Sequence, residues 1–324
     1  ACDRWGYKTN GSGLVVTMSQ DTDVPTGEGF TTSLKFDVTT ADTSTASAER
    51  VHFGQTIEAR NLQHLASATS SAKKVTLSFW VKSTITGTYA VAIYKGDQTA
   101  RLVNATYTIS SADTWEHKTI TFPGDTGGGG IDNDSGSGFQ FDWFLIAGTD
   151  STSGGAQTTW ANFAAASWAG GHNVNFGSST DNNYYITGVQ LEVGDQATDF
   201  EHLPFDVQFH RCERYYQVVD FTNGHAQAAN AYSASAGTTS YTLHTEMRAD
   251  PTITLATAGG SGGGLSFLTS AGAYPSTTGN HTASAISTHQ FKMDGASYSG
   301  LENAGSSVVY TTGHGHKHKC DAEL

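Results

Sequence analysis

Apolar and polar residues alternate in several short stretches of the first two hundred residues. In Leu34–Val38 and again in Val75–Val81, every second residue is apolar. Strict alternation with a period of two is typical of a β-strand with one buried face. The same pattern predicts strands at 88–94, 116–122, 139–146 and 184–193. So many strands separated by turn-forming residues predict a two-sheet antiparallel β-sandwich.

A different period follows residue 203. Phe205, Phe209, Cys212 and Tyr216 recur at i, i+4, i+7 and i+11, which places them on one face of a helix. Pro204 stands where a first helical residue can be a proline. We therefore predict a linker helix at 204–216 that separates a domain at 1–203 from a domain at 204–324. Short strands are expected after it, at 214–221, 240–247, 252–256, 265–268, 283–293 and from 307 to the end.

Two long stretches of small residues interrupt the first domain. Residues 123–134 contain four consecutive glycines and several acidic residues, and we expect them to form an exposed loop. Residues 147–179 also lack a regular pattern, but they include Trp160 and Trp168. Two indoles are large enough to hold an irregular connection against the sandwich.

Composition excludes several classes of protein. The 324 residues carry 17 Lys and Arg and 30 Asp and Glu, a formal net charge of −13, and include 37 glycines. Such an acidic chain is a poor ligand for nucleic acid, which is bound through clustered cations. No apolar run approaches the roughly 18 residues that span a bilayer. Three widely spaced cysteines make no disulfide framework.

Several blocks of sequence resemble bacteriophage tail-fibre and related virion appendage proteins. These blocks include Tyr185–Gly194, Ala197–Glu201, Arg211–Tyr216, Met247–Thr252 and the terminal Asp321–Leu324. The resemblance implies an all-β chain. It implies a jelly-roll domain similar to carbohydrate-binding modules, then the short helix and a small C-terminal β domain at the end of a homotrimeric fibre.

Outward-facing polar and aromatic residues of the first domain are candidates for sugar binding. Sugars are bound by flat aromatic faces together with nearby hydrogen-bonding groups. The alternation places Trp80 opposite to its apolar neighbours, and we expect a shared outer face there. The alternative is that a loop or a neighbouring subunit covers these aromatics. The candidate glycan contacts are Trp80, Lys82, Tyr94, Gln190 and Glu192.

Two groups of residues have the chemistry of metal ligands. Asp125, Asp132, Asn133 and Asp134 offer the oxygen ligands that calcium prefers, although a solvated acidic loop without metal explains them as well. Near the end, His314, His316 and His318 share one face of a predicted strand. This run resembles the His-x-His motifs of T-even phage fibre tips. If two of them, His314 with His316 or His316 with His318, face the axis of a trimer, three chains supply six imidazoles, a set suited to iron or nickel more than to tetrahedral zinc. A metal-free polar strand is the alternative.

We expect the chain to be a non-catalytic phage virion protein that binds a host cell-surface polysaccharide. No paired-carboxylate, nucleophile–base or metalloprotease motif occurs, although Asp142 and Glu192 are among the carboxylates that an enzyme would use. The expected partners are other virion proteins and two further copies of the chain. The alternatives are a module of a glycan-degrading enzyme and an architectural capsid or tail decoration protein.

Overall fold

The structure is a computed structural model of the chain. It describes residues 4–220, 226–233, 235–255, 265–269, 272–275, 281–296, 305–311 and 317–323. Two compact units are present, Ala1–His202 and Leu203–Glu323. The division lies one residue before the domain boundary expected from the sequence.

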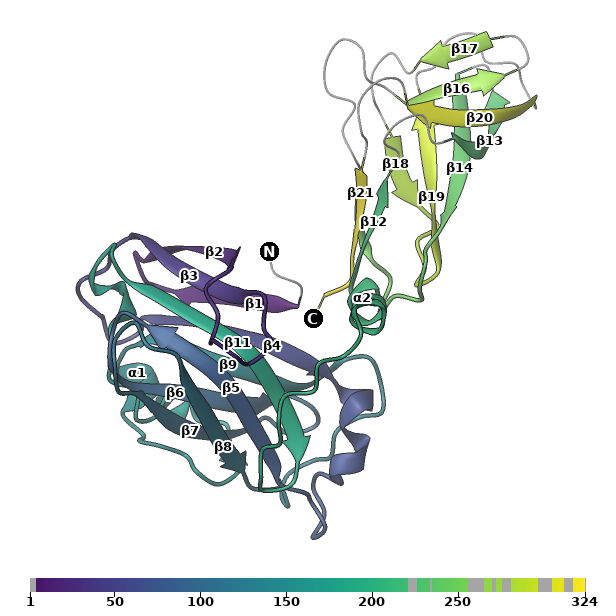
Figure 1. The fold of residues 1–324 in the computed structure, drawn as a ribbon. Coiled ribbons are helices and arrows are strands. Elements are labelled where there is room, and N and C mark those ends of the chain that lie inside the picture. Colours follow the sequence, from purple (N-terminus) through teal and green to yellow (C-terminus); the bar gives the residue numbers. More distant parts are fainter. Residues whose placement is uncertain are drawn as a thin grey trace. The chain divides into compact units, whose positions relative to one another are not determined.

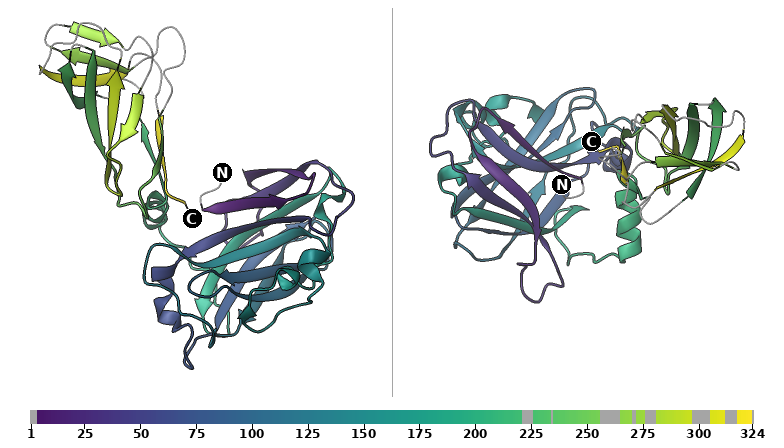
Figure 2. Two further views of the ribbon diagram at one scale, coloured as in Figure 1. Left: turned by 180° about the vertical axis from the view of Figure 1, so that it is seen from behind. Right: turned by 90° about the horizontal axis from the view of Figure 1, so that it is seen from above.

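The first unit is a sandwich of two antiparallel sheets, which appear as stacked layers in Figures 1 and 2. One sheet has six strands, in the order β1 (Trp5–Asn10), β4 (Arg50–Glu58), β9 (Ser137–Ala147), β6 (Gly87–Lys95), β7 (Arg101–Ile109) and β10 (Ala161–Asn162). The other has five, in the order β2 (Val15–Asp21), β3 (Ser33–Thr40), β11 (Asn183–Val193), β5 (Val75–Ser83) and β8 (Glu116–Phe122). The prediction of an all-β antiparallel sandwich is confirmed.

Alternation correctly identified the strands with the clearest apolar face. In β5, the side chains of Val75, Leu77, Phe79 and Val81 all belong to the core. The sequence prediction missed β1, β2, β4, β7 and the two-residue strand β10. In β4 and β7, polar residues such as His52 and Asn104 are buried beneath covering loops on the outer face of the sheet. A strand that is covered on both sides loses the simple in-and-out pattern.

Aromatic rings fill the space between the two sheets. Phe53 stacks on Trp143 with ring centroids 5.8 Å apart, and Phe36 lies 4.2 Å from Phe53. The hydroxyls of Tyr107 and Tyr184 form a buried hydrogen bond of 2.7 Å. Burial raises the pKa of Tyr107 well above its ordinary value, so both phenols stay neutral and satisfy each other.

Connections cover both ends and one outer face of the sandwich. The 3-10 helix η1 (Ala59–Leu65) packs Leu62 and Leu65 into the core. The irregular stretch after β9 contains α1 (Thr149–Thr152), η2 (Ala165–Ser167) and η3 (Phe176–Ser178). Within it, Trp168 packs against Phe144 and Phe163 on the outer face of the six-stranded sheet. Trp168 therefore holds this stretch against the sandwich, as expected. The contacts of Trp160 are given with the candidate site.

The second unit begins with α2 (Phe205–Glu213), which ends three residues earlier than predicted because Tyr216 already belongs to a strand. Its strands form two antiparallel sheets. The smaller sheet has the order β12 (Tyr216–Asp220), β21 (Lys317–Asp321) and β15 (Thr252–Thr254). The larger has the order β17 (Gly272–Pro275), β16 (Leu265–Thr269), β20 (Gly305–Thr311), β13 (Ala226–Ser233), β14 (Ala236–Thr242), β19 (Gln290–Ala296) and β18 (His281–Ser284).

The apolar face of α2 is largely exposed. Phe205 and Phe209 stack on each other with centroids 5.7 Å apart, yet their exposed fractions are 80% and 51%. The helix has nine residues. Among the described helices, none is long and apolar enough to cross a membrane.

Candidate functional site

A groove of about 350 Å³ lies on the outer face of the five-stranded sheet. Strands β5, β8 and β11 supply its floor, and two loop segments supply its walls. We call it the Trp80 groove. Its lining residues are Gly27, Glu28, Ser78, Trp80, His117, Gly188, Thr198, Asp199, Phe200 and His202. A volume of this size lies at the small end of the range for ligand pockets.

The floor of the Trp80 groove is aromatic. Trp80 of β5 and His117 of β8 are directly opposite each other in the antiparallel register. Their ring centroids are 5.0 Å apart, with an angle of 39° between the planes. Trp80 is half-buried, so its ring is supported from below and still reaches the groove. As the alternation predicts, it points away from the core.

Residues 194–202, which we call the covering segment, form one wall of the groove. Its position is fixed by two side chains of β11. Gln190 Oε1 accepts a hydrogen bond from the Glu201 amide at 2.8 Å. Glu192 accepts bonds from the Thr198 hydroxyl at 2.6 Å and the Thr198 amide at 3.0 Å. These bonds lower the pKa of the Glu192 carboxyl.

Gln190 and Glu192 therefore lie on the predicted outer face, but they bind the covering segment and are not the glycan contacts that we expected. Their acceptor oxygens are already occupied by the covering segment. They position the wall of the groove, and neither is among the residues that line it. The sequence could not show this, because the bonds join β11 to a segment without regular structure.

An aromatic cluster of Phe30, Phe200 and His202 joins the covering segment to the second wall, which contains Gly27 and Glu28. The three rings have centroids 5.0–5.2 Å apart, and the His202 Nε2 atom lies 3.1 Å from the Glu28 carbonyl oxygen. Gly188 makes room for this cluster. Its φ is +59°, and a Cβ atom there would lie 2.5 Å from the Phe30 ring. Only glycine satisfies both the backbone and the space.

Lys82 is two residues from Trp80 on the same face, but it is buried. Its ammonium group is paired with Asp23 and lies 4.5 Å from the centre of the Tyr185 ring. Trp115 donates its Nε1–H to the same carboxylate at 2.9 Å. The cation is therefore compensated and covered by aromatic rings. The expectation that Lys82 contacts a glycan is not supported by this placement.

Tyr94 lies on the opposite side of the sandwich. It belongs to β6 of the six-stranded sheet, where its ring packs edge-on against Phe163 at 5.3 Å. The prediction that Tyr94 shares an outer face with Trp80 is wrong. Alternation correctly places Tyr94 outside the core, but it does not indicate which of the two sheets the strand joins.

Carboxylates considered for catalysis are also separated. Asp142 lies on the outer face of the six-stranded sheet, where it accepts hydrogen bonds from Trp168 Nε1 at 3.1 Å and from Gln140. Burial raises its pKa. Glu192 lies on the outer face of the five-stranded sheet. These two carboxylates do not form an acid–base pair.

Asp125, a predicted calcium ligand, is buried and neutralised by two side-chain cations. Lys95 Nζ lies 2.6 Å from its Oδ2 atom, and Arg101 Nη2 lies 2.8 Å from its Oδ1 atom. Lys95 has no exposed surface and also donates to the Gly129 carbonyl at 2.6 Å. An ammonium group thus occupies the position where a bound cation would face this carboxylate. The expectation that 123–134 is simply an exposed loop is wrong at Asp125.

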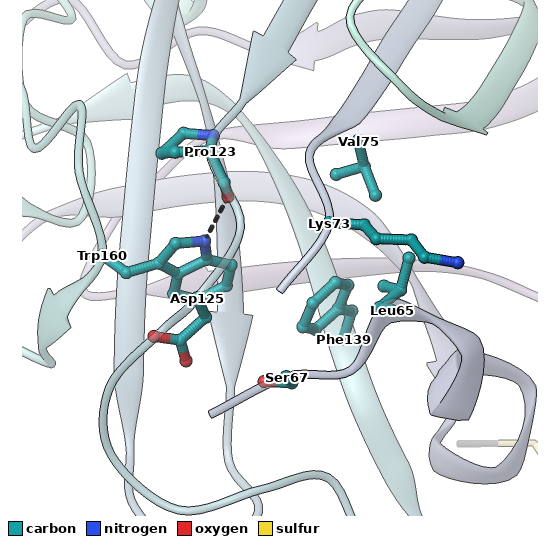
Figure 3. Close-up of a pocket in the computed structure, with 8 residues that line it drawn as sticks. All are labelled: Leu65, Ser67, Lys73, Val75, Pro123, Asp125, Phe139 and Trp160. Carbon is teal, nitrogen blue, oxygen red and sulfur yellow. Dashed lines mark hydrogen bonds between the residues drawn. The ribbon is translucent and has the colours of Figure 1, made fainter. Parts of the chain in front are cut away.

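Figure 3 shows the small cavity beside this ion pair. Trp160 lines the cavity and donates its Nε1–H to the Pro123 carbonyl at 2.8 Å. The same indole stacks on Phe139 with centroids 5.5 Å apart. The cavity measures only about 10 Å³. That is room for no more than one water molecule. Trp160 and its neighbours are therefore packed too closely to admit a sugar.

The other predicted calcium ligands lie apart from Asp125. Asp132 accepts a bond from Gln98 at 2.7 Å, and Asp134 accepts one from the Gly136 amide at 2.8 Å. Burial, and then the charges of Asp132 and Asp134, raise the pKa of nearby Asp97. Within the described part of the chain, no three acidic, His or Cys side chains are arranged to hold a metal ion. Calcium binding by Asp132, Asn133 and Asp134 stays a prediction.

The predicted histidine strand is described only in part. His314 and His316 lie outside the described residues. In β21, His318 and Cys320 point inward while Lys317, Lys319 and Asp321 point outward, which is the predicted alternation. His318 is fully buried, with its ring 5.7 Å from Tyr241 and 6.3 Å from Phe291. It packs inside its own unit, so the expectation that His318 is a metal ligand is corrected.

Sequence reasoning missed most of the groove besides Trp80. His117 follows from alternation in β8 once that strand is known to pair with β5. Glu28, Asp199, Phe200 and His202 come from irregular segments, for which no periodic signal exists. Their contribution appears only when the covering segment is placed on the sheet.

Comparisons with known proteins give partial similarities. No family model and no curated protein matches the chain. The enzymatically active domain of tailspike protein 4 of bacteriophage CBA120 has a TM-score of 0.33 and 17% identity, over 59% of this chain and 19% of that one. A CBM4 structure has a TM-score of 0.31 and 14% identity, over 59% and 88%.

A third structure, the family 11 carbohydrate-binding module of the Clostridium thermocellum cellulase Lic26A-Cel5E, has a TM-score of 0.30 and 14% identity. It covers 60% of this chain and 95% of that one. The Trp80 groove itself, and not these similarities, is the basis of the function proposed next.

Proposed function

We propose that the first unit is a non-catalytic glycan-binding module and that the Trp80 groove is its binding site. The observation that carries this proposal is that the Trp80 indole and several polar groups line the same groove. Trp80 offers a flat apolar surface, and Ser78 and His117 offer a hydroxyl and an imidazole group within the same lining. This pairing suits a pyranose ring, which has an apolar face and a rim of hydroxyls.

The proposal is tested by replacing Trp80 with alanine in the full chain. We expect the affinity for a bound oligosaccharide to fall by about 1–3 kcal/mol, since an aromatic anchor at the centre of a site carries much of the binding energy. Binding is measured by calorimetry against neutral oligosaccharides and purified bacterial surface polysaccharides. The same samples are checked for hydrolysis products, which would favour an enzyme.

A matched control is available in Tyr232, an aromatic residue of the second unit that is half-exposed. Tyr232→Ala removes a comparable exposed ring outside the groove and should leave glycan affinity unchanged. Unfolding of Trp80→Ala in a thermal scan would show that Trp80 is a packing residue. Unchanged affinity in a folded Trp80→Ala protein would refute the site.

We further propose that the polysaccharide belongs to a host cell surface and that the chain is part of a phage virion appendage. Two features support this. The sequence blocks described above resemble those of tail fibres, and the exposed face of α2 with Phe205 and Phe209 offers apolar surface for association with further copies. In that assembly the expected partners are two identical chains and other virion proteins.

A further inference from the structure

We infer that the Trp80 groove selects neutral or amino-bearing sugars and discriminates against acidic ones. This inference rests on the proposed function, because it concerns the ligand of the same groove. It is based on the charges that surround the groove. Charge selection would narrow the class of polysaccharide that the groove can bind.

Among the described residues, those that line the groove include two acidic residues and no Lys or Arg. The two acidic residues, Glu28 and Asp199, belong to its walls. With both imidazoles neutral, the lining has a formal charge of −2, one from each carboxylate. A groove that is lined by charges of one sign strengthens the electrostatic field that acts on a bound ligand.

Nearby groups add to this negative charge. Glu192 remains an ionised carboxylate behind the covering segment, since its bonds from Thr198 lower its pKa. Glu201, in the covering segment, is exposed. Lys82, on the same face of the sheet, is already paired with Asp23, and Lys74 lies 3.6 Å from Asp195. Lys82 is thereby neutralised, and the exposed Lys74 already faces the carboxylate of Asp195.

The aromatic floor favours the opposite charge. An ammonium group above the Trp80 ring would gain a cation–π attraction, whereas a carboxylate would meet the negative face of the ring. The aromatic floor and the acidic walls of the groove therefore both favour a cationic group over an anionic one. An acidic sugar would have to give up its hydration to enter a groove with no charged partner for it.

The test compares hexasaccharides that differ only at C6. Cellohexaose, maltohexaose and mannohexaose are each prepared in three forms, in which C6 is the carbon of a hydroxymethyl, an aminomethyl or a carboxylate group. Binding to the full chain is measured at neutral pH by calorimetry. We expect the amino form to bind at least as tightly as the neutral form, and the carboxylate form to bind about tenfold more weakly, a difference of about 1.4 kcal/mol.

Two further measurements identify the source of the discrimination. It should shrink at high ionic strength, because exposed charges are then screened. It should also shrink in the double variant Glu28→Gln and Asp199→Asn, whereas Asp150→Asn in α1, an exposed carboxylate outside the groove, should leave it intact.

Equal or tighter binding of the carboxylate form would overturn this inference while leaving glycan binding at the groove in place. Discrimination that survives unchanged in the Glu28 and Asp199 double variant would also overturn it. If none of the nine hexasaccharides and no surface polysaccharide binds, the proposed function fails, and the charge selection fails with it.

Discussion

Replacing Lys95 with methionine should destabilise the first unit strongly, because it breaks an ion pair that is shielded from water. The Lys95 ammonium has no exposed surface and donates to Asp125, to the Gly129 carbonyl and, at 3.4 Å, to Ser67. Methionine fills a similar volume but supplies none of these bonds. Asp125 would keep Arg101, whose guanidinium stays 2.8 Å away.

The expected magnitude follows from this geometry. Removing one partner of a buried pair typically costs about 3–5 kcal/mol. The remaining Arg101 contact reduces the penalty, so we expect about 3 kcal/mol for Lys95→Met. Asp125→Asn should cost more, about 4–5 kcal/mol, because it leaves two cations facing a neutral amide. With a urea m-value of about 2–3 kcal/mol/M, these losses shift the midpoint by about 1–2.5 M.

The assay is urea unfolding of the full chain followed by tryptophan fluorescence. All six tryptophans lie in the first 168 residues, so this signal reports the first unit alone. Lys74→Met is the matched control. It breaks an ion pair with Asp195 whose side chains are 58% and 64% exposed, and exposed pairs contribute at most about 1 kcal/mol.

A midpoint for Lys95→Met within error of the Lys74→Met value would refute this account of the buried pair. The same titration also bears on calcium. Since Lys95 and Arg101 already neutralise Asp125, adding a chelator to the wild-type protein should not move its midpoint. A large loss of stability on chelation would restore a metal to this loop.

The first unit should also lose stability in mild acid. Burial lowers the pKa of His172 to about 4. Between about pH 6.5 and pH 4, the unfolded chain therefore binds a proton at this residue and the folded chain does not. For His172 this costs about 2 kcal/mol between pH 7 and pH 5. Burial also lowers the pKa of His52 to about 3, so His172→Gln should remove about half of the slope of the tryptophan-monitored pH profile; an unchanged slope would contradict this. Separately, light scattering on the untagged full chain should give three times the monomer mass, and elemental analysis should find about one iron, nickel or zinc ion per three chains if His314 and His316 bind metal. A stable monomer would refute the fibre proposal, and less metal would leave the histidines as part of a polar strand.

The sequence by itself determined the strands that have a clear alternation of apolar and polar residues, and which side of each of these strands faces the core. Val75, Leu77 and Phe79 are buried, and Trp80 points outward, as alternation predicts. The change of period near Pro204 likewise indicated α2. These features are local: they depend on neighbours within a few residues, and the burial of one face imposes them directly on the pattern.

Only the tertiary structure decided which outward side chains meet. Tyr94 and Trp80 have the same outward parity but belong to different sheets. Asp125 has the chemistry of a metal ligand, yet Lys95, thirty residues away in sequence, neutralises it. Gln190 and Glu192 hold the covering segment. Parity is set by the period of a single strand, whereas strand partners and loop positions result from long-range packing, which leaves no periodic trace in the sequence.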